Sequence, residues 1–320
     1  MIQTASGLAA DVRWNGANAR TPFARCHGCE LRGSQLCRVI QDERLFGTHP
    51  PVLRRFGRGK RIVGQGEASG FLGVIRRGYA RRSVIKVSGN RILVGLAMPG
   101  DIVGGLAERE HDHDFEAATD VEICTYDSGT VKQQLEINPR LRRVMLREID
   151  HQHHRTLGLL WHNGTLTSRE RIIAFLVRAV AFMPTEPLPD GGLVLSMEID
   201  RGDWADLTNT AVETISRTLR YLEEKDLVTS LTPYRFRVRD LDLLAIIAGV
   251  EPPARRLGKG GLSKRMETHF GSPNSDKRMT AVNALARGAH RVNDVMKPVS
   301  VQKRGLAKRR PEDVQEEIRD

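Results

Sequence analysis

The chain has 320 residues, of which 40% are hydrophobic and four are cysteines, and its formal net charge is +11. A chain of this length buries a full hydrophobic core without covalent cross-links, so we do not expect its cysteines to form a disulfide framework. No apolar run approaches the ~20 residues that span a bilayer, and the first residues lack the charged start and apolar stretch of a secretion signal. We therefore expect no membrane span and a cytoplasmic location, where thiols stay reduced and free to bind metal.

The first chemical motif is a cysteine-rich loop in the weakly patterned segment 1–50. The stretch CHGCELRGSQLC places Cys26, Cys29 and Cys37 in a C-x2-C-x7-C spacing, and Cys124 lies far downstream in VEICTYD. Four thiolates are the usual ligands of a [4Fe-4S] cluster, but zinc also accepts four thiolates. A redox dithiol would instead need C-x-x-C at a helix start after a strand, and the context here is a loop. The spacing alone leaves both the cluster and zinc open.

Residues 51–135 have the pattern of an antiparallel β domain. Strand-length pieces such as YARRSVIKV and NRILVGLAM alternate with turn signals, among them Val87-Ser88-Gly89-Asn90 and Pro99-Gly100. This alternation predicts strands that close into a roll of the jelly-roll kind. Because no G-x-G-x-x-G opens a helix after a strand, the glycines are interpreted as turn residues and not as a nucleotide-binding fingerprint.

A long helix is predicted over 136–164, with Pro139 at a position that favours helix starts. One seam steps along it by three or four residues, and its members are Leu141, Met145, Ile149, Gln152, Thr156 and Leu160. A seam with a polar middle suits a helix that pairs weakly with a second copy of itself. It suits a helix that packs against its own roll equally well, so the periodicity leaves both interpretations open.

Residues 165–250 have the pattern of a winged helix-turn-helix. Two short helices are predicted on either side of Asn209, a residue type that tolerates the left-handed turn which this motif needs. The strand-forming stretch TSLTPYRFRVR that follows suits the wing. In this fold the second helix enters the major groove of DNA, and the residues at its start face the base edges.

Three side chains at the start of that second helix are suited to reading bases. Glu213, Ser216 and Arg217 are spaced i, i+3 and i+4, so they project from one helix face. Arginine binds guanine through two hydrogen bonds, glutamate accepts one from cytosine, and a serine hydroxyl can do either. The alternative is an ordinary surface helix with an ion pair on this face.

The segment 251–320 holds sixteen basic and nine acidic residues. Its polar, glycine-containing composition predicts a basic and largely disordered tail. Excess positive charge favours a polyanionic partner, but most of the excess lies in this tail. The prediction of nucleic-acid binding therefore depends on the helix-turn-helix.

A family resemblance follows from these motifs. The stretch RGDWADLTNTAVETISRTL resembles the DNA-reading module of the CRP/FNR superfamily of bacterial transcription regulators, whose recognition helix carries E-T-[IV]-S-R. The stretch MPGDIVG and the glycine spacing resemble the sensor roll of these regulators, and the helix from Pro139 resembles their dimerisation helix. The cysteine pattern resembles the FNR-type oxygen-sensing branch, which holds a [4Fe-4S] cluster.

The resemblance implies a set of site residues and partners. The implied cluster ligands are Cys26, Cys29, Cys37 and Cys124, and the implied DNA contacts are Glu213, Ser216 and Arg217. The implied partners are double-stranded DNA with palindromic half-sites of the TTGAT type, a second copy of the chain, and RNA polymerase. Members that bind cyclic nucleotides carry a Gly-Glu pair and an Arg-Ser or Arg-Thr pair, and the corresponding stretch GGLAEREHDHDFEAATD lacks such a phosphate clamp.

The sequence thus predicts an α+β regulator with no nucleophile and base arranged for catalysis, and so no enzymatic activity. We expect it to respond to oxygen through a [4Fe-4S] cluster. The alternative is a regulator of the same fold whose sensor domain is fixed by zinc or controlled by a small ligand. The predicted parts are an N-terminal segment with the cysteine loop (1–50), an antiparallel β-roll sensor domain (51–135), a dimerisation helix (136–164), a winged helix-turn-helix (165–250) and the tail (251–320).

Overall fold

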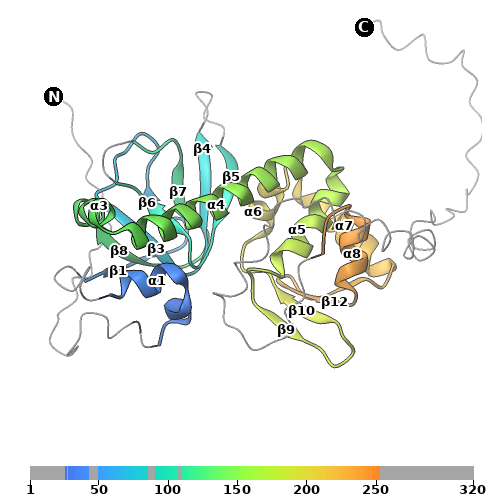
Figure 1. Ribbon diagram of the computed structural model, residues 1–320. Coiled ribbons are helices and arrows are strands. Elements are labelled where there is room, and N and C mark those ends of the chain that lie inside the picture. The colour runs from blue at the N-terminus through green and yellow to red at the C-terminus, as the bar shows by residue number, and fades with distance from the viewer. Residues whose placement is uncertain (1–25, 27, 43–49, 86–90, 107–109, 253–320) are drawn as a thin grey trace, which may run out of the picture.

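The computed structural model describes residues 26, 28–42, 50–85, 91–106 and 110–252. The predicted turn at 87–90 and the predicted tail beyond residue 252 lie outside these ranges. Figure 1 shows a β-roll at one end of the molecule, a small module of helices and strands at the other, and a long helix that connects them. No helix within the described ranges carries an apolar stretch sufficient to cross a bilayer.

Two antiparallel four-stranded sheets form the roll, in the orders β1-β8-β3-β6 and β2-β7-β4-β5. Their strands are β1 (Val52–Phe56), β2 (Arg61–Val63), β3 (Phe71–Arg77), β4 (Ala80–Ile85), β5 (Arg91–Ala97), β6 (Ile102–Gly104), β7 (Asp114–Ala117) and β8 (Val121–Asp127). Ile75 and Ile123 are among the apolar side chains that fill the space between the sheets, because alternate residues of a strand point to the same face. The predicted turn at Pro99-Gly100 is confirmed, and Gly100 has a φ of 98°, which glycine adopts without strain. The expected antiparallel roll is confirmed.

Helices cover the outer face of the sheet β1-β8-β3-β6. They are α1 (Gln35–Ile40), which follows the 3-10 turn η2 (Glu30–Gly33), together with α3 (Ser128–Ile137) and the first half of α4 (Pro139–Thr165). Leu36 and Val39 of α1 share a buried cluster with Leu141 and Met145 of α4 and with side chains of the sheet. A second small core therefore lies between the roll and these helices.

The long helix α4 runs from the roll to the C-terminal module (Figure 1). Asn138 caps its start, because the side-chain oxygen accepts hydrogen bonds from two backbone amides of the first turn. The seam predicted along this helix faces the chain's own roll, which covers only part of its length. Leu141 and Met145 are buried against the roll of the same chain, whereas Ile149 and Leu160 are exposed. Packing against its own roll therefore fixes one side of the helix, and a different side is left exposed.

The C-terminal module is a winged helix-turn-helix, as expected. Its elements are α5 (Ser168–Ala179), β9 (Thr185–Pro187), β10 (Leu193–Ser196), α6 (Arg201–Leu207), α7 (Val212–Glu224), β11 (Val228–Thr232), β12 (Arg235–Val238) and α8 (Leu241–Ile247). The strands pair in the order β11-β12-β10-β9. A capping box of Thr167 and Glu170 begins α5. Trp204 and Phe236, whose ring centroids are 6.1 Å apart, lie buried at the centre of the module.

Candidate metal centre and nucleic-acid interface

Cys124 lies on the outer face of the roll. Its neighbour Ile123 points into the core between the sheets, so the alternation along β8 turns Cys124 outward. The register of the sheet places it between Leu53 of β1 and Val74 of β3. This is the sheet that α1 and α4 cover, and Cys124 packs partly buried against their shared core. The downstream cysteine therefore lies beneath the segment that carries the other three.

The N-terminal cysteines lie on a compact segment held against that face. The backbone N–H of Cys29 donates to the carbonyl of Cys26 at 3.2 Å, which closes a tight turn between them. Cys37 lies in the first turn of α1, where its backbone N–H donates to the hydroxyl of the capping residue Ser34 at 3.1 Å. All three thiols are partly buried and none is in a disulfide. Buried side chains of α1 such as Leu36 anchor the segment on α4.

The four thiols are close enough to influence one another's ionisation. Burial, and after it the charges of the other three thiolates, raises the pKa of Cys124 to about 12. Burial also raises the pKa of Cys37 to about 11, although the hydrogen bond with Ser34 acts in the opposite direction. Burial and Cys29 raise the pKa of Cys26. The thiols of Cys26, Cys37 and Cys124 are therefore protonated at neutral pH without a cation, and a metal centre bound there would release protons on forming thiolates.

Two residues near the thiols, Tyr126 and Arg76, are not indicated by the cysteine spacing. Tyr126 follows Cys124 by two residues on the same strand, and it is buried in the core that α1 and α4 share. Arg76 of β3 forms an ion pair with Glu122 at 3.3 Å, and its charge opposes the rise in the pKa of Cys124. The two-residue period of β8 could have pointed to Tyr126, but only the pairing of β3 with β8 brings Arg76 to the thiols.

The four thiols do not form a ready metal site as they lie in the structure. Within the described ranges, no three His, Cys, Asp or Glu side chains are gathered closely enough to hold a metal ion. Four thiols are by their chemistry suited to a [4Fe-4S] cluster and to zinc alike.

The helix-turn-helix is formed by α6 and α7. Thr208 ends α6, and its buried hydroxyl donates to the carbonyl of Trp204 at 2.8 Å, so the polar group is satisfied inside the core. Asn209 has a φ of 47°, which confirms the left-handed turn residue expected at this position. The N–H of Thr210 then donates to the carbonyl of Ala205 at 2.9 Å and closes the turn.

The second helix, α7, is strongly two-sided. Its buried side chains are Ile215, Thr218, Leu219 and Leu222. Glu213, Ser216 and Arg217 all lie exposed on the opposite side. The ion pair considered as an alternative is not formed, because neither Glu213 nor Arg217 makes one with any residue in the described part of the chain. The Ser216 hydroxyl donates to the carbonyl of Val212 at 3.2 Å.

One further residue of this helix belongs with the exposed face. Arg220 follows Arg217 by three positions and is exposed on the same side of α7. The E-T-I-S-R motif does not include Arg220, although the helical period places it on the same face. An arginine one turn further from the helix start suits a phosphate better than a base edge, since the first residues of such a helix enter the groove most deeply.

Comparison with known proteins supports both halves of the molecule. Residues 53–138 match the cyclic nucleotide-binding domain family, and residues 170–247 match the Crp-like helix-turn-helix domain family. The chain is 28% identical over 229 residues to a probable transcriptional activator of Rhizobium leguminosarum bv. viciae, covering 70% of this chain and 92% of that protein. It is 24% identical over 216 residues to the transcriptional activator protein FnrL of Cereibacter sphaeroides, covering 65% and 85%. Among solved structures, FixK2 from Bradyrhizobium japonicum has a TM-score of 0.56 at 17% identity, covering 64% of this chain and 99% of FixK2.

A β-roll joined by a long helix to a winged helix-turn-helix defines a DNA-binding transcription regulator and not an enzyme. The chain belongs to the CRP/FNR superfamily of transcription regulators. The match to the cyclic nucleotide-binding family concerns the fold of the roll and does not assign a ligand to it.

Proposed function

We propose that this chain is an oxygen-responsive regulator that holds a [4Fe-4S] cluster and binds palindromic DNA as a homodimer. The proposed ligands are Cys26, Cys29, Cys37 and Cys124. The observation that carries the proposal is that the C-x2-C-x7-C segment lies against the strand that bears the fourth cysteine. When bound, such a cluster would supply reactivity towards oxygen on the outer face of the roll.

The packing of α1 gives this site a path to the rest of the molecule. Leu36, Val39 and Ile40 of α1 are buried, and they share one core with Leu141 and Val144 of α4. Gln35 of α1 also accepts a hydrogen bond from the Arg147 side chain of α4. The cysteine segment therefore supports the first half of α4 directly. A change that loosens this segment removes buried contacts from the helix that is proposed to pair.

The exposed side of α4 is suited to pairing with a second copy. Its exposed apolar residues are Leu146, Ile149, Leu157, Leu160 and Trp161. These recur at helical spacing along one side, away from the side that packs on the roll. Pairing of two α4 helices would place two α7 helices about 34 to 36 Å apart, one DNA turn, so that a two-fold protein meets a palindromic site. The proposed half-site is of the TTGAT type, read by Glu213, Ser216 and Arg217, and RNA polymerase is the proposed further partner.

The test of the cluster is the protein purified without oxygen. We expect a brown solution with broad visible absorption and about four irons and four sulfides per chain. Admission of air should bleach the absorption and weaken binding to palindromic DNA in parallel. A colourless protein with one zinc per chain would contradict the cluster and support the zinc-fixed alternative. A protein with neither metal would point to control by a small ligand.

The proposed pairing face gives a prediction for oligomeric state. Leu157→Glu should weaken the anaerobic dimer by more than about tenfold, because the two-fold axis would bring two carboxylates together in an apolar contact. Sedimentation at graded protein concentration under nitrogen measures this. Ile137→Glu is the matched control, since Ile137 is an exposed apolar residue at the end of α3 and lies outside α4. Equal dimer affinity in the two variants would show that α4 does not pair through this face.

A further inference from the structure

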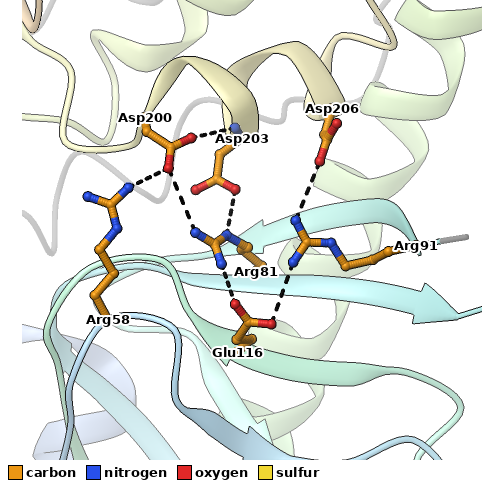
Figure 2. Close-up of polar contacts among 7 residues, drawn as sticks. All are labelled: Arg58, Arg81, Arg91, Glu116, Asp200, Asp203 and Asp206. Atoms are coloured by element: carbon orange, nitrogen blue, oxygen red, sulfur yellow. Dashed lines mark hydrogen bonds and ion pairs between the residues drawn. The ribbon is translucent and has the colours of Figure 1, made fainter.

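The first helix of the helix-turn-helix is attached to the roll by a buried ionic contact. Arg81 of β4 is 8% exposed, and its side chain extends from the sheet β2-β7-β4-β5 to the N-terminal end of α6 (Figure 2). There its Nε lies 2.5 Å from a carboxylate oxygen of Asp203, which is 2% exposed. A second guanidinium nitrogen lies 3.9 Å from Asp200. The contact joins residues 122 positions apart in the chain.

Residues of the roll hold Arg81 in this direction. Glu116 of β7 is the direct cross-strand partner of Arg81, and its carboxylate forms an ion pair with the third guanidinium nitrogen. Glu116 in turn interacts with Arg91 of β5 at 3.5 Å. Since the guanidinium is planar, a carboxylate behind it fixes the direction in which its remaining N–H groups point. The roll thus presents Arg81 to α6 already oriented.

The end of α6 is built to receive this charge. Asp200 is the N-cap of the helix, and it accepts the backbone N–H of Asp203 at 2.7 Å. Its other carboxylate oxygen faces Arg58 and Arg81 (Figure 2). The N-terminus of a helix carries positive partial charge, so a lone arginine would be repelled there, and the two aspartates reverse the local sign. Further along α6, Asp206 lies 3.6 Å from Arg91.

The ionic contact lies beside an apolar one. Tyr79 precedes Arg81 by two residues, packs edge-on against Phe182, and donates its hydroxyl hydrogen to the Phe182 carbonyl at 2.8 Å. The apolar contact holds the module near the roll, but it has no strongly directional charge. The ion pair between Arg81 and Asp203 is directional, and because it is buried, loss of either partner leaves an uncompensated charge. Burial raises the pKa of Asp203, and the hydrogen bond from Arg81 offsets part of that rise.

We propose that Arg81 is a positioning residue for DNA reading, which fixes α6 on the roll and thereby sets the direction of the recognition helix α7. In this conformation the reading face of α7 is exposed and not covered by the roll, so the contact supports DNA binding. The helices α6 and α7 pack directly on each other, so an orientation imposed on one is passed to the other. In the proposed dimer, the same contact made in both chains fixes the spacing between the two α7 helices. This last step rests on the homodimer proposed above.

The test uses the full chain with Arg81→Met, which keeps much of the side-chain volume and removes the charge. We expect amide hydrogen exchange in 200–208 to speed up by about tenfold or more, because α6 loses its attachment. Affinity for a palindromic site should fall by roughly tenfold. The wild-type protein should bind more weakly to sites with one base pair inserted or removed between the half-sites than to the native spacing. In Arg81→Met this difference in affinity should disappear. A purely structural role would lower affinity for every spacing alike.

Controls separate this proposal from loss of folding and from the dimer. Arg61→Met removes an arginine whose ion pairs stay within the roll, and it should leave both the exchange of α6 and the spacing preference unchanged. Fluorescence of the buried Trp204 reports whether the module stays folded. If Arg81→Met unfolds it, Asp203→Asn, which keeps the shape, should show the same changes more weakly.

The outcomes are distinct. Unchanged exchange and unchanged spacing preference in a folded Arg81→Met protein would overturn the positioning role. If the wild-type protein shows no preference for a palindrome, the proposed dimeric function fails instead. The positioning role is then judged by exchange of α6 alone, with faster exchange supporting it and wild-type exchange overturning it.

Discussion

Cys124→Ala is expected to yield a folded protein that no longer assembles an iron-sulfur centre and no longer gains DNA affinity when oxygen is removed. Three thiolates hold a four-iron centre poorly, and the core between the two sheets does not include this side chain. Allosteric coupling between two sites typically changes affinity by roughly 5- to 150-fold. Loss of the cluster should therefore lower the anaerobic affinity for palindromic DNA by a factor in that range. Visible absorption, iron content and competition binding under nitrogen measure the three effects.

The same outcome is expected for Cys26→Ala, Cys29→Ala and Cys37→Ala, since each removes one of the four proposed ligands. His27→Ala, within the same loop, is the control and should leave absorption and DNA binding close to those of the wild-type chain. If Cys124→Ala kept both its colour and its oxygen-dependent binding, the proposed ligand set would be wrong. Loss of colour with unchanged binding would instead separate the metal centre from DNA recognition.

The second large effect is expected at the exposed face of α7. Arg217→Ala removes the side chain best placed to grip a guanine through two hydrogen bonds, and it should weaken binding to the preferred site by about 1 to 3 kcal/mol. Discrimination at the guanine position should relax as well. Since Arg217 has no ion pair with the described residues, its removal leaves no carboxylate unpaired there, and folding stability should change little.

Two variants on the same helix face separate base reading from charge. Glu213→Ala deletes a repulsion with phosphate and should strengthen non-specific binding while weakening discrimination. Arg220→Ala removes the same charge as Arg217→Ala, one turn further along, and should weaken all sequences about equally. Competition against sites altered one base pair at a time measures all three. Equal losses on specific and non-specific DNA for Arg217→Ala would limit that residue to the DNA backbone.

The sequence determined those features that local chemistry governs. The E-T-I-S-R motif with Asn209 before it predicted the two helices and their turn, because the left-handed conformation there admits few residue types. The glycine-punctuated strands predicted the antiparallel roll, because turn residues and a two-residue period are read directly from the chain. The cysteine spacing indicated a metal centre, but its chemistry left iron-sulfur and zinc open.

The tertiary structure decided what depends on contacts between distant segments. Which side of α4 is exposed could not be read from its periodicity, because apolar residues occur on two sides and only the roll determines which one is covered. Likewise, Arg76 and Tyr126 become neighbours of the thiols only through strand pairing and burial. Nothing in the sequence around Arg81 marks it as different from the other arginines. Its role follows from Glu116 behind it and Asp203 in front of it, brought together from separate strands and a helix by the fold.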